Sequence, residues 1–123
     1  NNNLIKYYDA LYYLRINNVE NAEKCCKQII HYDPTYNRAY VLLAQIYMQQ
    51  HDIYKAEKVL VQMIQNNAIT EEGRDLLLQI YKMQGMSENA ATKKFIKHFL
   101  DKYKKEGNKK SYDHFYNIYQ QLN

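Results

Sequence analysis

The chain has 123 residues, with 17 Lys and Arg against 13 Asp and Glu, and a formal net charge of +4. That length suits a single domain with a continuous core. One Pro and three Gly are too few for the turns of a sheet protein, and no alternation of apolar and polar residues persists, so we predict an all-α fold. No apolar run approaches the roughly 18 residues of a membrane span, so we expect no membrane-spanning segment.

Apolar residues at helical spacing predict a first helix at about residues 4–16. Asn17 and Asn18 supply turn and capping chemistry before a second helix at about 19–32. Asp33-Pro34 ends that helix, because proline disfavours helical geometry at the residue before it. The side chains expected on the apolar sides of this pair are Ile5, Tyr8, Ala10, Leu11, Tyr12, Tyr13, Ala22, Cys26, Ile29 and Ile30.

The stretch from residue 40 to residue 68 predicts two more amphipathic helices, joined by a tight polar turn at 49–52. Two such helices can bury their apolar stripes only by packing on each other and on neighbouring elements. The stripe of the third helix is Tyr40, Leu43, Ala44 and Tyr47. The stripe of the fourth is Ala56, Val59, Leu60, Met63 and Ile64.

Three further helices are predicted in the remainder of the chain. Thr70, followed by two glutamates, predicts the N-cap of a fifth helix that runs to about residue 84. Gly85 supplies a turn, and Ser87 is expected to cap a sixth helix. After a break at 107–108, Ser111 is expected to open a final helix. The expected apolar side chains are Leu76, Leu77, Ile80, Tyr81, Ala91, Phe95, Ile96, Phe99, Leu100, Tyr103, Tyr112, Phe115, Tyr116, Tyr119 and Leu122.

These helices repeat with a period of 34 residues. The turn-and-helix segment at 51–56 has counterparts at 17–22 and 85–90. Tyrosines keep the same period at positions 13, 47 and 81, and alanines at positions 22, 56 and 90. We expect these alanines to lie where the helices approach closely, although the apolar face of the sixth helix is shifted by one residue. A fixed period in this range is typical of a solenoid, in which each unit completes the core of its neighbour.

A helix–turn–helix unit of 34 residues with these side chains resembles the tetratricopeptide repeat (TPR) family. The central unit carries most of the family pattern, with Tyr40 where Trp is usual, then Leu43, Ala44, Tyr47 and Ala56. The two outer units match the pattern less well, because lysines and an aspartate stand at several of their expected core positions.

The resemblance implies an α-solenoid, a right-handed superhelix of three helix–turn–helix repeats. The repeats are expected at about residues 4–35, 37–69 and 71–106. A C-terminal capping helix at about 110–122 completes a single TPR domain over residues 1–123.

In TPR proteins the first helix of each pair lines a concave groove. The resemblance therefore implies a non-catalytic scaffold or adaptor that binds a peptide segment of a partner protein, within a larger protein or complex. The residues implied to face the groove are Tyr7, Leu11, Leu14, Arg38, Val41, Gln45, Met48, Glu72, Asp75, Gln79 and Lys82. The alternative for the first three is that sequence outside this chain covers them.

We expect the partner segment to be extended or helical, with an apolar anchor laid across the first helices of repeats one and two. Co-chaperone TPR domains that grip the acidic C-termini of heat-shock proteins place Lys, Asn and Arg at set groove positions. We expect no such carboxylate clamp, because those positions here read Tyr7, Leu11, Gln45, Asp75 and Gln79.

Eight lysines lie between residues 93 and 110, against Asp101 and Glu106. A solvated helix face is the ordinary explanation of such a run. The alternative function is binding of nucleic acid or another polyanion, with Lys104, Lys105, Lys109 and Lys110 as the candidate contacts. The run has no Arg and few aromatic residues, so any such contact is expected to be weak, independent of base sequence and sensitive to salt.

No pattern of catalytic or metal-binding residues is present, and we expect no enzyme activity, metal or cofactor. The four histidines lie in different repeats without a Cys, Asp or Glu at a metal-site spacing. Cys25 and Cys26 are neighbours on a helix and cannot readily form a disulfide with each other, so core packing is favoured over a redox pair.

The paired cysteines favour a reducing, intracellular location, cytoplasmic or nuclear. No signal-peptide pattern opens the chain, and its first residue is Asn rather than Met, so we expect either a piece of a longer protein or a processed chain. The sequence leaves the oligomeric state and the identity of the partner open.

Overall fold

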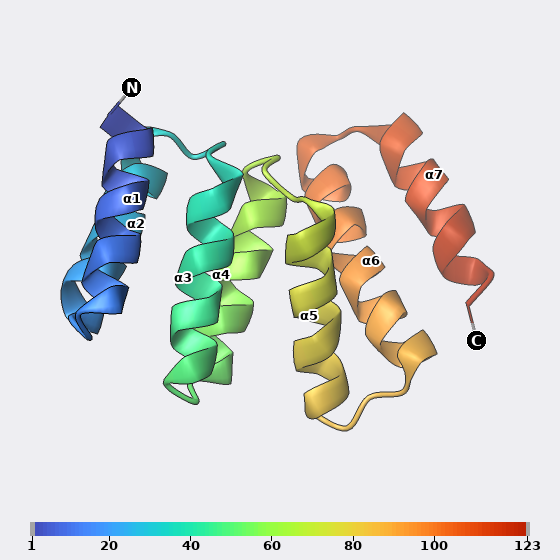
Figure 1. Cartoon of the computed structure of the whole chain (residues 1–123). Helices are drawn as coiled ribbons and strands as arrows, with labels where there is room; N and C mark the ends of the chain where they lie inside the picture. The colour runs from blue at the N-terminus through green and yellow to red at the C-terminus, as the bar shows by residue number, and fades with distance from the viewer. Residues whose placement is uncertain (1, 123) are drawn as a thin grey trace. The chain divides into compact units, whose positions relative to one another are not determined.

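The computed structural model describes residues 2–122, which contain helices and no strand. The all-α prediction is confirmed. In chain order the helices are α1 (Asn2–Arg15), α2 (Val19–Tyr32), α3 (Asn37–Gln49), α4 (Ile53–Gln65), α5 (Glu71–Met83), α6 (Glu88–Glu106) and α7 (Lys109–Gln120) (Figure 1). The chain divides into two compact units, one up to Gly73 and the other from Arg74 onward.

One turn geometry recurs at the 34-residue period. Asn17, His51 and Gly85 follow α1, α3 and α5, and all three have a positive φ, of 61°, 61° and 93°. In each turn the next residue donates its backbone N–H to the carbonyl of a tyrosine five residues earlier. These bonds are Asn18 to Tyr13 at 2.7 Å, Asp52 to Tyr47 at 2.9 Å and Met86 to Tyr81 at 3.1 Å. This is the Schellman arrangement, so the repeated tyrosines mark where each of these helices ends.

The third turn contains one residue more than the other two. In the first two turns the residue after the left-handed position is also the N-cap: Asn18 accepts from the N–H of residue 21 and Asp52 from that of residue 55. In the third turn Met86 occupies that place, and the cap is Ser87, which accepts from the N–H of residue 90. The expected cap at Ser87 is therefore confirmed, one step beyond the strict period.

Because of this extra residue, the buried alanine of α6 lies one position later than the 34-residue period predicts. Ala22 and Ala56, each four residues after its N-cap, are fully buried. In α6 the residue four after the cap is Ala91, which is also fully buried, whereas Ala90 is exposed. The prediction that Ala90 lies at a close helix contact was wrong, and the longer turn is the physical reason.

The core of the first unit is densest around α3 and α4. Tyr40 is fully buried, and its hydroxyl donates to the carbonyl of Pro34 at 2.6 Å and accepts from the side-chain amide of Asn66 at 2.9 Å. The hydroxyl of this large core residue thus has partners, as a buried polar group requires. Met63 is also buried, and a Cβ added at Gly73 would stand 2.6 Å from its sulfur, so the glycine makes room for a large side chain. The buried residues of these two helices are Ala39, Tyr40, Val41, Leu42, Leu43, Ala44, Ile46, Tyr47, Ala56, Val59, Leu60, Met63 and Ile64.

In the second unit, aromatic rings join α6 to α7, which lie side by side (Figure 1). Phe115 of α7 stacks on Phe99 of α6, with ring centroids 4.8 Å apart, and lies 5.7 Å from the ring of Tyr103. The start of α7 differs from the prediction. The helix begins at Lys109, because Asn108 is its N-cap and accepts from the backbone N–H of Ser111 at 3.1 Å. Ser111 therefore lies inside the first turn.

Candidate functional site

In the first unit, two of the predicted groove residues are in direct contact. The guanidinium carbon of Arg38, at the start of α3, lies 4.6 Å from the centroid of the Tyr7 ring on α1. The ring of Tyr36 lies 6.4 Å from the same Tyr7 ring. A guanidinium over an aromatic face is a favourable cation–π arrangement. The structure therefore brings the two predicted stripes, on α1 and α3, together at this point.

The other predicted residues of these stripes differ in how much surface they offer. Leu11 and Gln45 are exposed, and Leu14 and Met48 are half-buried. Val41 is buried in the core of the first unit and offers little surface to a partner. Leu11, Leu14 and Met48 are thus the accessible apolar side chains of this set, and Arg38 and Gln45 are its accessible polar ones.

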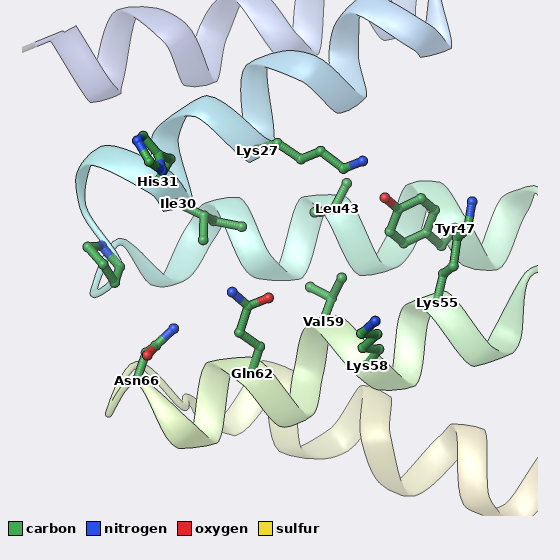
Figure 2. A pocket seen from close by; sticks show the side chains of 11 residues that line it. Lys27, Ile30, His31, Leu43, Tyr47, Lys55, Lys58, Val59, Gln62 and Asn66 are labelled. Atoms are coloured by element: carbon green, nitrogen blue, oxygen red, sulfur yellow. The ribbon is translucent and has the colours of Figure 1, made fainter.

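A cleft that the sequence did not suggest lies in the first unit, between α2 and α4 (Figure 2). Its volume is about 570 Å³, and side chains of α3 form its floor. The lining residues are Lys27, Ile30, His31, Pro34, Leu43, Tyr47, Lys55, Lys58, Val59, Gln62 and Asn66. The cleft belongs to the second helices of the pairs, whereas the predicted groove belongs to the first helices.

In the second unit, the predicted residues Asp75, Gln79 and Lys82 line one depression on α5, of about 490 Å³. Leu78 and Met83 complete its lining and were not predicted. Leu78 lies three residues after Asp75 and Met83 four after Gln79, and this spacing was the signal in the sequence that could have identified them.

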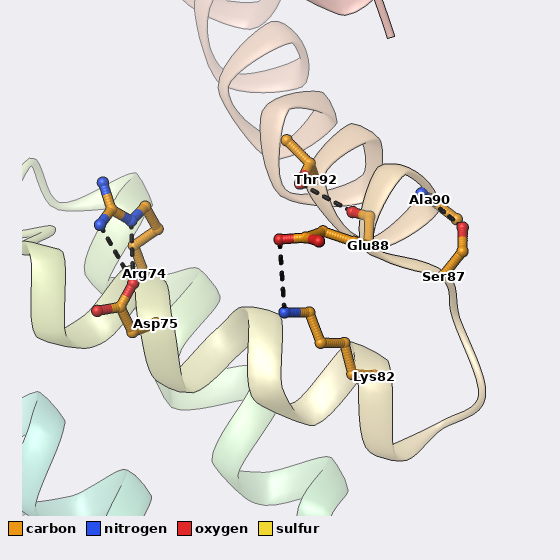
Figure 3. Close-up of polar contacts among 7 residues, drawn as sticks. All are labelled: Arg74, Asp75, Lys82, Ser87, Glu88, Ala90 and Thr92. Carbon is orange, nitrogen blue, oxygen red and sulfur yellow. Dashed lines mark hydrogen bonds and ion pairs between the residues drawn. The ribbon is translucent and has the colours of Figure 1, made fainter. Parts of the chain in front are cut away.

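Two of these polar residues already take part in ion pairs (Figure 3). A carboxylate oxygen of Asp75 lies 3.2 Å from the guanidinium of the preceding residue, Arg74. The amino group of Lys82 lies 3.9 Å from the carboxylate of Glu88, across the turn between α5 and α6. Both pairs are exposed, so each is expected to be weak and open to exchange with a ligand.

Several lysines of the segment from residue 93 to residue 110 already interact with other side chains of the chain. Lys102 is buried and pairs with Glu106, and Lys109 pairs with Asp113 at 2.7 Å. Two further amino groups lie over tyrosine rings: that of Lys93 is 5.0 Å from the centroid of Tyr119, and that of Lys94 is 4.6 Å from that of Tyr81. Of the four proposed polyanion contacts, Lys104, Lys105 and Lys110 are exposed and Lys109 is held in an ion pair.

Two of those four lysines line a small depression of about 320 Å³ at the turn between α6 and α7. Lys104 and Lys109 lie there with Gly107 and the rings of Tyr103 and Tyr112. The sequence suggested few aromatic residues in this segment, but the turn brings these two rings next to the lysines.

Two histidines and one cysteine have structural surroundings: His51, His98 and the buried Cys26. His51 takes the left-handed position of a turn, and the hydroxyl of Tyr81 lies 2.6 Å from Nε2 of His98. Burial raises the pKa of the Cys26 thiol to about 12, and Cys25 and Cys26 are both free. Over residues 2–122 no group of three or more His, Cys, Asp or Glu side chains could hold a metal ion. In the same part of the chain, no helix is both long enough and apolar enough to cross a lipid bilayer.

The model of the tetratricopeptide repeat family matches residues 13–80, more than half of the chain. The chain belongs to the tetratricopeptide repeat family. The match covers α2, α3 and α4 completely and most of α5, which is the part of this TPR protein where turns and buried residues keep the strict period. Its fold is accordingly an all-α helical repeat. Repeats of this family generally mediate protein–protein interaction. Among characterised protein sequences and solved structures, none matches the chain.

Proposed function

We propose that this TPR protein is a non-catalytic interaction module that holds a short extended or helical segment of a partner protein against α1 and α3. The observation that carries the proposal is the contact between Arg38 and Tyr7, which joins the exposed stripes of the two helices. Beside that contact, Leu11, Leu14 and Met48 offer apolar surface. Groove recognition through apolar anchors at helical spacing is an established mode of peptide binding.

The polar residues of the same surface can orient a bound peptide. Arg38 and Gln45 are exposed, and each can hydrogen-bond to a peptide carbonyl or carboxylate. Burial of one Leu-sized anchor contributes roughly 1.5–3 kcal/mol. A micromolar complex corresponds to about −8.2 kcal/mol, so one or two anchors supply a large part of it. The helix pairs α1–α2, α3–α4 and α5–α6 act in this proposal as three repeats with α7 as a cap, in an intracellular protein.

The experiment begins with an affinity pull-down using this chain as bait, at low and at moderate salt. A captured partner is then tested against the double variant Leu11→Glu/Met48→Glu, which places two charges on the apolar surface. We expect at least a tenfold loss of affinity, since two desolvated anchors are lost. The matched control is Tyr54→Glu, because Tyr54 on α4 is highly exposed and lies on neither stripe. Unchanged circular dichroism shows that the variants are folded, and equal binding by both would contradict the proposal.

The second candidate function is contact with a polyanion through Lys104, Lys105, Lys109 and Lys110. The depression that combines Lys104, Lys109 and two tyrosine rings supports it, because cations beside aromatic faces suit single-stranded nucleic acid. The test measures anisotropy of a labelled single-stranded oligonucleotide with the native chain and with all four lysines changed to Gln. Binding that falls steeply with salt and is lost in the variant supports this function, since phosphate contacts release counterions. Binding of a protein partner to the apolar surface should change little with salt.

A further inference from the structure

The cleft between α2 and α4 combines a cationic rim with an apolar floor (Figure 2). Leu43 of α3 and Val59 of α4 face each other at its centre. Both are almost completely buried, so the floor can take the tip of an apolar side chain but not a large hydrophobic body. The exposed ring of Pro34 extends the apolar surface at one end.

The charged groups of the rim are all of one sign. Lys27 on α2 and Lys55 and Lys58 on α4 line the cleft, with His31 at the opposite end from Lys55. None of the described residues that line it carries a carboxylate. A concave surface with one sign of charge attracts ligands of the opposite sign.

The lysines nearest Tyr47 are held in place by neighbouring groups. The carboxylate of Glu23 accepts from the amino group of Lys27 at 2.8 Å and from the hydroxyl of Tyr47 at 2.8 Å. The amino group of Lys55 lies 5.6 Å from the centroid of the Tyr47 ring. Glu23 therefore neutralises Lys27, but the contact of Lys55 with Asp52 is long, at 3.9 Å, and exposed. Lys55 and Lys58, one helical turn apart, remain the two cations most available to a ligand.

Two of these lysines are not explained by the repeat itself. Counted from the N-caps, Lys55 matches Asn21 and Ala90 in the other pairs, and Lys27 matches Val61 and Ile96. Lys58, in contrast, has a lysine at the matching place of both other pairs. The combination of Lys27, Lys55 and Lys58 around one cleft is thus a local feature of α2 and α4.

We propose that this cleft docks an acidic amphipathic segment of a protein partner. One or two carboxylates of that segment pair with Lys55 and Lys58, and one apolar side chain lies over Leu43 and Val59. The apolar floor favours a peptide over a nucleic acid, because it takes an apolar side chain, whereas the Tyr47 ring is buried and offers little face for a base to stack on. This site is additional to the α1–α3 surface and does not depend on it.

The test uses a short fluorescein-labelled peptide, rich in Glu and with a central Leu, and measures its anisotropy with the full chain. Changing Lys55→Gln and Lys58→Gln together should weaken binding by about tenfold, because two exposed charge pairs are lost. Lys24→Gln with Lys97→Gln removes the same charge at exposed positions that line neither this cleft nor the proposed polyanion site, and should change affinity by less than about twofold. Both pairs of lysines are exposed, and circular dichroism confirms that each variant is folded.

The matched peptides and the groove variant separate the possible outcomes. A peptide with Gln in place of Glu, and another with Ala in place of Leu, should each bind more weakly than the original. The Leu11→Glu/Met48→Glu variant should bind the peptide as the native chain does, so failure of the α1–α3 site leaves this result intact. The proposal is overturned if the two lysine pairs matter equally, if binding does not saturate, or if a single-stranded oligonucleotide binds more tightly through Lys55 and Lys58.

Discussion

Helices α1 and α3 occupy the same place in the 34-residue period but differ in burial. On α1, the side chains of Ile5, Tyr8 and Tyr12 are 61%, 56% and 58% exposed. Thirty-four residues further on, the matching side chains are at most 7% exposed: Ala39, Leu42 and Ile46. The difference arises because α2 packs on α3, whereas no described helix covers this side of α1. In a repeat protein the helix supplies the apolar stripe, and its neighbour decides whether that stripe is core or surface.

The largest expected effect comes from truncating the core of the central pair. Leu60 on α4 is fully buried, so Leu60→Ala should lower the free energy of unfolding by about 2–5 kcal/mol. The control is Ile5→Ala on the exposed side of α1, which should change the free energy of unfolding by no more than about 0.5 kcal/mol. Urea denaturation followed by circular dichroism measures both. Similar losses at the two positions would show that something covers α1 in solution.

Small-to-large changes at the alanines test the longer third turn. Ala91→Leu adds three carbons at a fully buried position and should lower the free energy of unfolding by about 1–3 kcal/mol. Ala56→Leu should cost a similar amount, because Ala56 is buried in the corresponding place of α4. Ala90→Leu adds the same atoms at an exposed position and should be nearly neutral. Thermal melts of the three variants suffice, and a larger loss for Ala90→Leu than for Ala91→Leu would refute the shifted register.

The left-handed turns should respond by smaller amounts and in a defined order. Gly85→Ala places a Cβ at a φ of 93° and should lower the free energy of unfolding by about 1–2 kcal/mol. Asn17→Gly, at the matching turn, should change it by only a few tenths of a kcal/mol, because Asn already tolerates this geometry. Denaturant midpoints compare the two. Equal changes in the free energy of unfolding would mean that the two positions do not share the left-handed geometry in solution.

The smallest expected effect concerns the carboxylate that links α2 to α3. The hydrogen bond from Lys27 lowers the pKa of Glu23, helped by the hydroxyl of Tyr47 and opposed by partial burial. Because the folded-state pKa lies below the ordinary value of 4.5, the contribution of Glu23 is present above pH 4.5 and is lost as the pH falls through the folded-state pKa. Glu23→Gln should cost less than about 1 kcal/mol at pH 7 and less still at pH 3, since the pair is partly exposed to solvent. Chemical denaturation at the two pH values measures this, and an equal loss at both would assign the effect to packing.

Much of the fold could be predicted because its signals are local. Each of these signals depends on a few neighbouring residues: helix periodicity, the caps at Asn18 and Thr70, and the turn at Gly85. The extra residue at Met86 was harder to place, since a turn of either length accepts the same residue types. The true cap of α7, Asn108, was mistaken for part of a break.

The candidate sites were less predictable, because they depend on which helices become neighbours. Val41 was assigned to the groove by its register, but the neighbouring helices bury it. The cleft between α2 and α4 joins Lys27 to Lys55, which lie on different helices and share no sequence pattern. Only the packing of α2, α3 and α4 brings such residues together.

The repeated turns also have a consequence for how quickly the chain reaches its native state. Each Schellman turn and N-cap is closed by bonds between residues at most five positions apart, as in Asp52 to Tyr47. Loops this short form in well under a microsecond, and contacts of low sequence separation favour rapid folding. A helix pair can therefore assemble before its neighbours do, and growth by addition of pairs on either side avoids a search for distant partners. The α3–α4 pair, which has more buried side chains than the α1–α2 pair, is the expected nucleus from which this growth proceeds. Hydrogen exchange slower in α1 than in α3 would argue against that order.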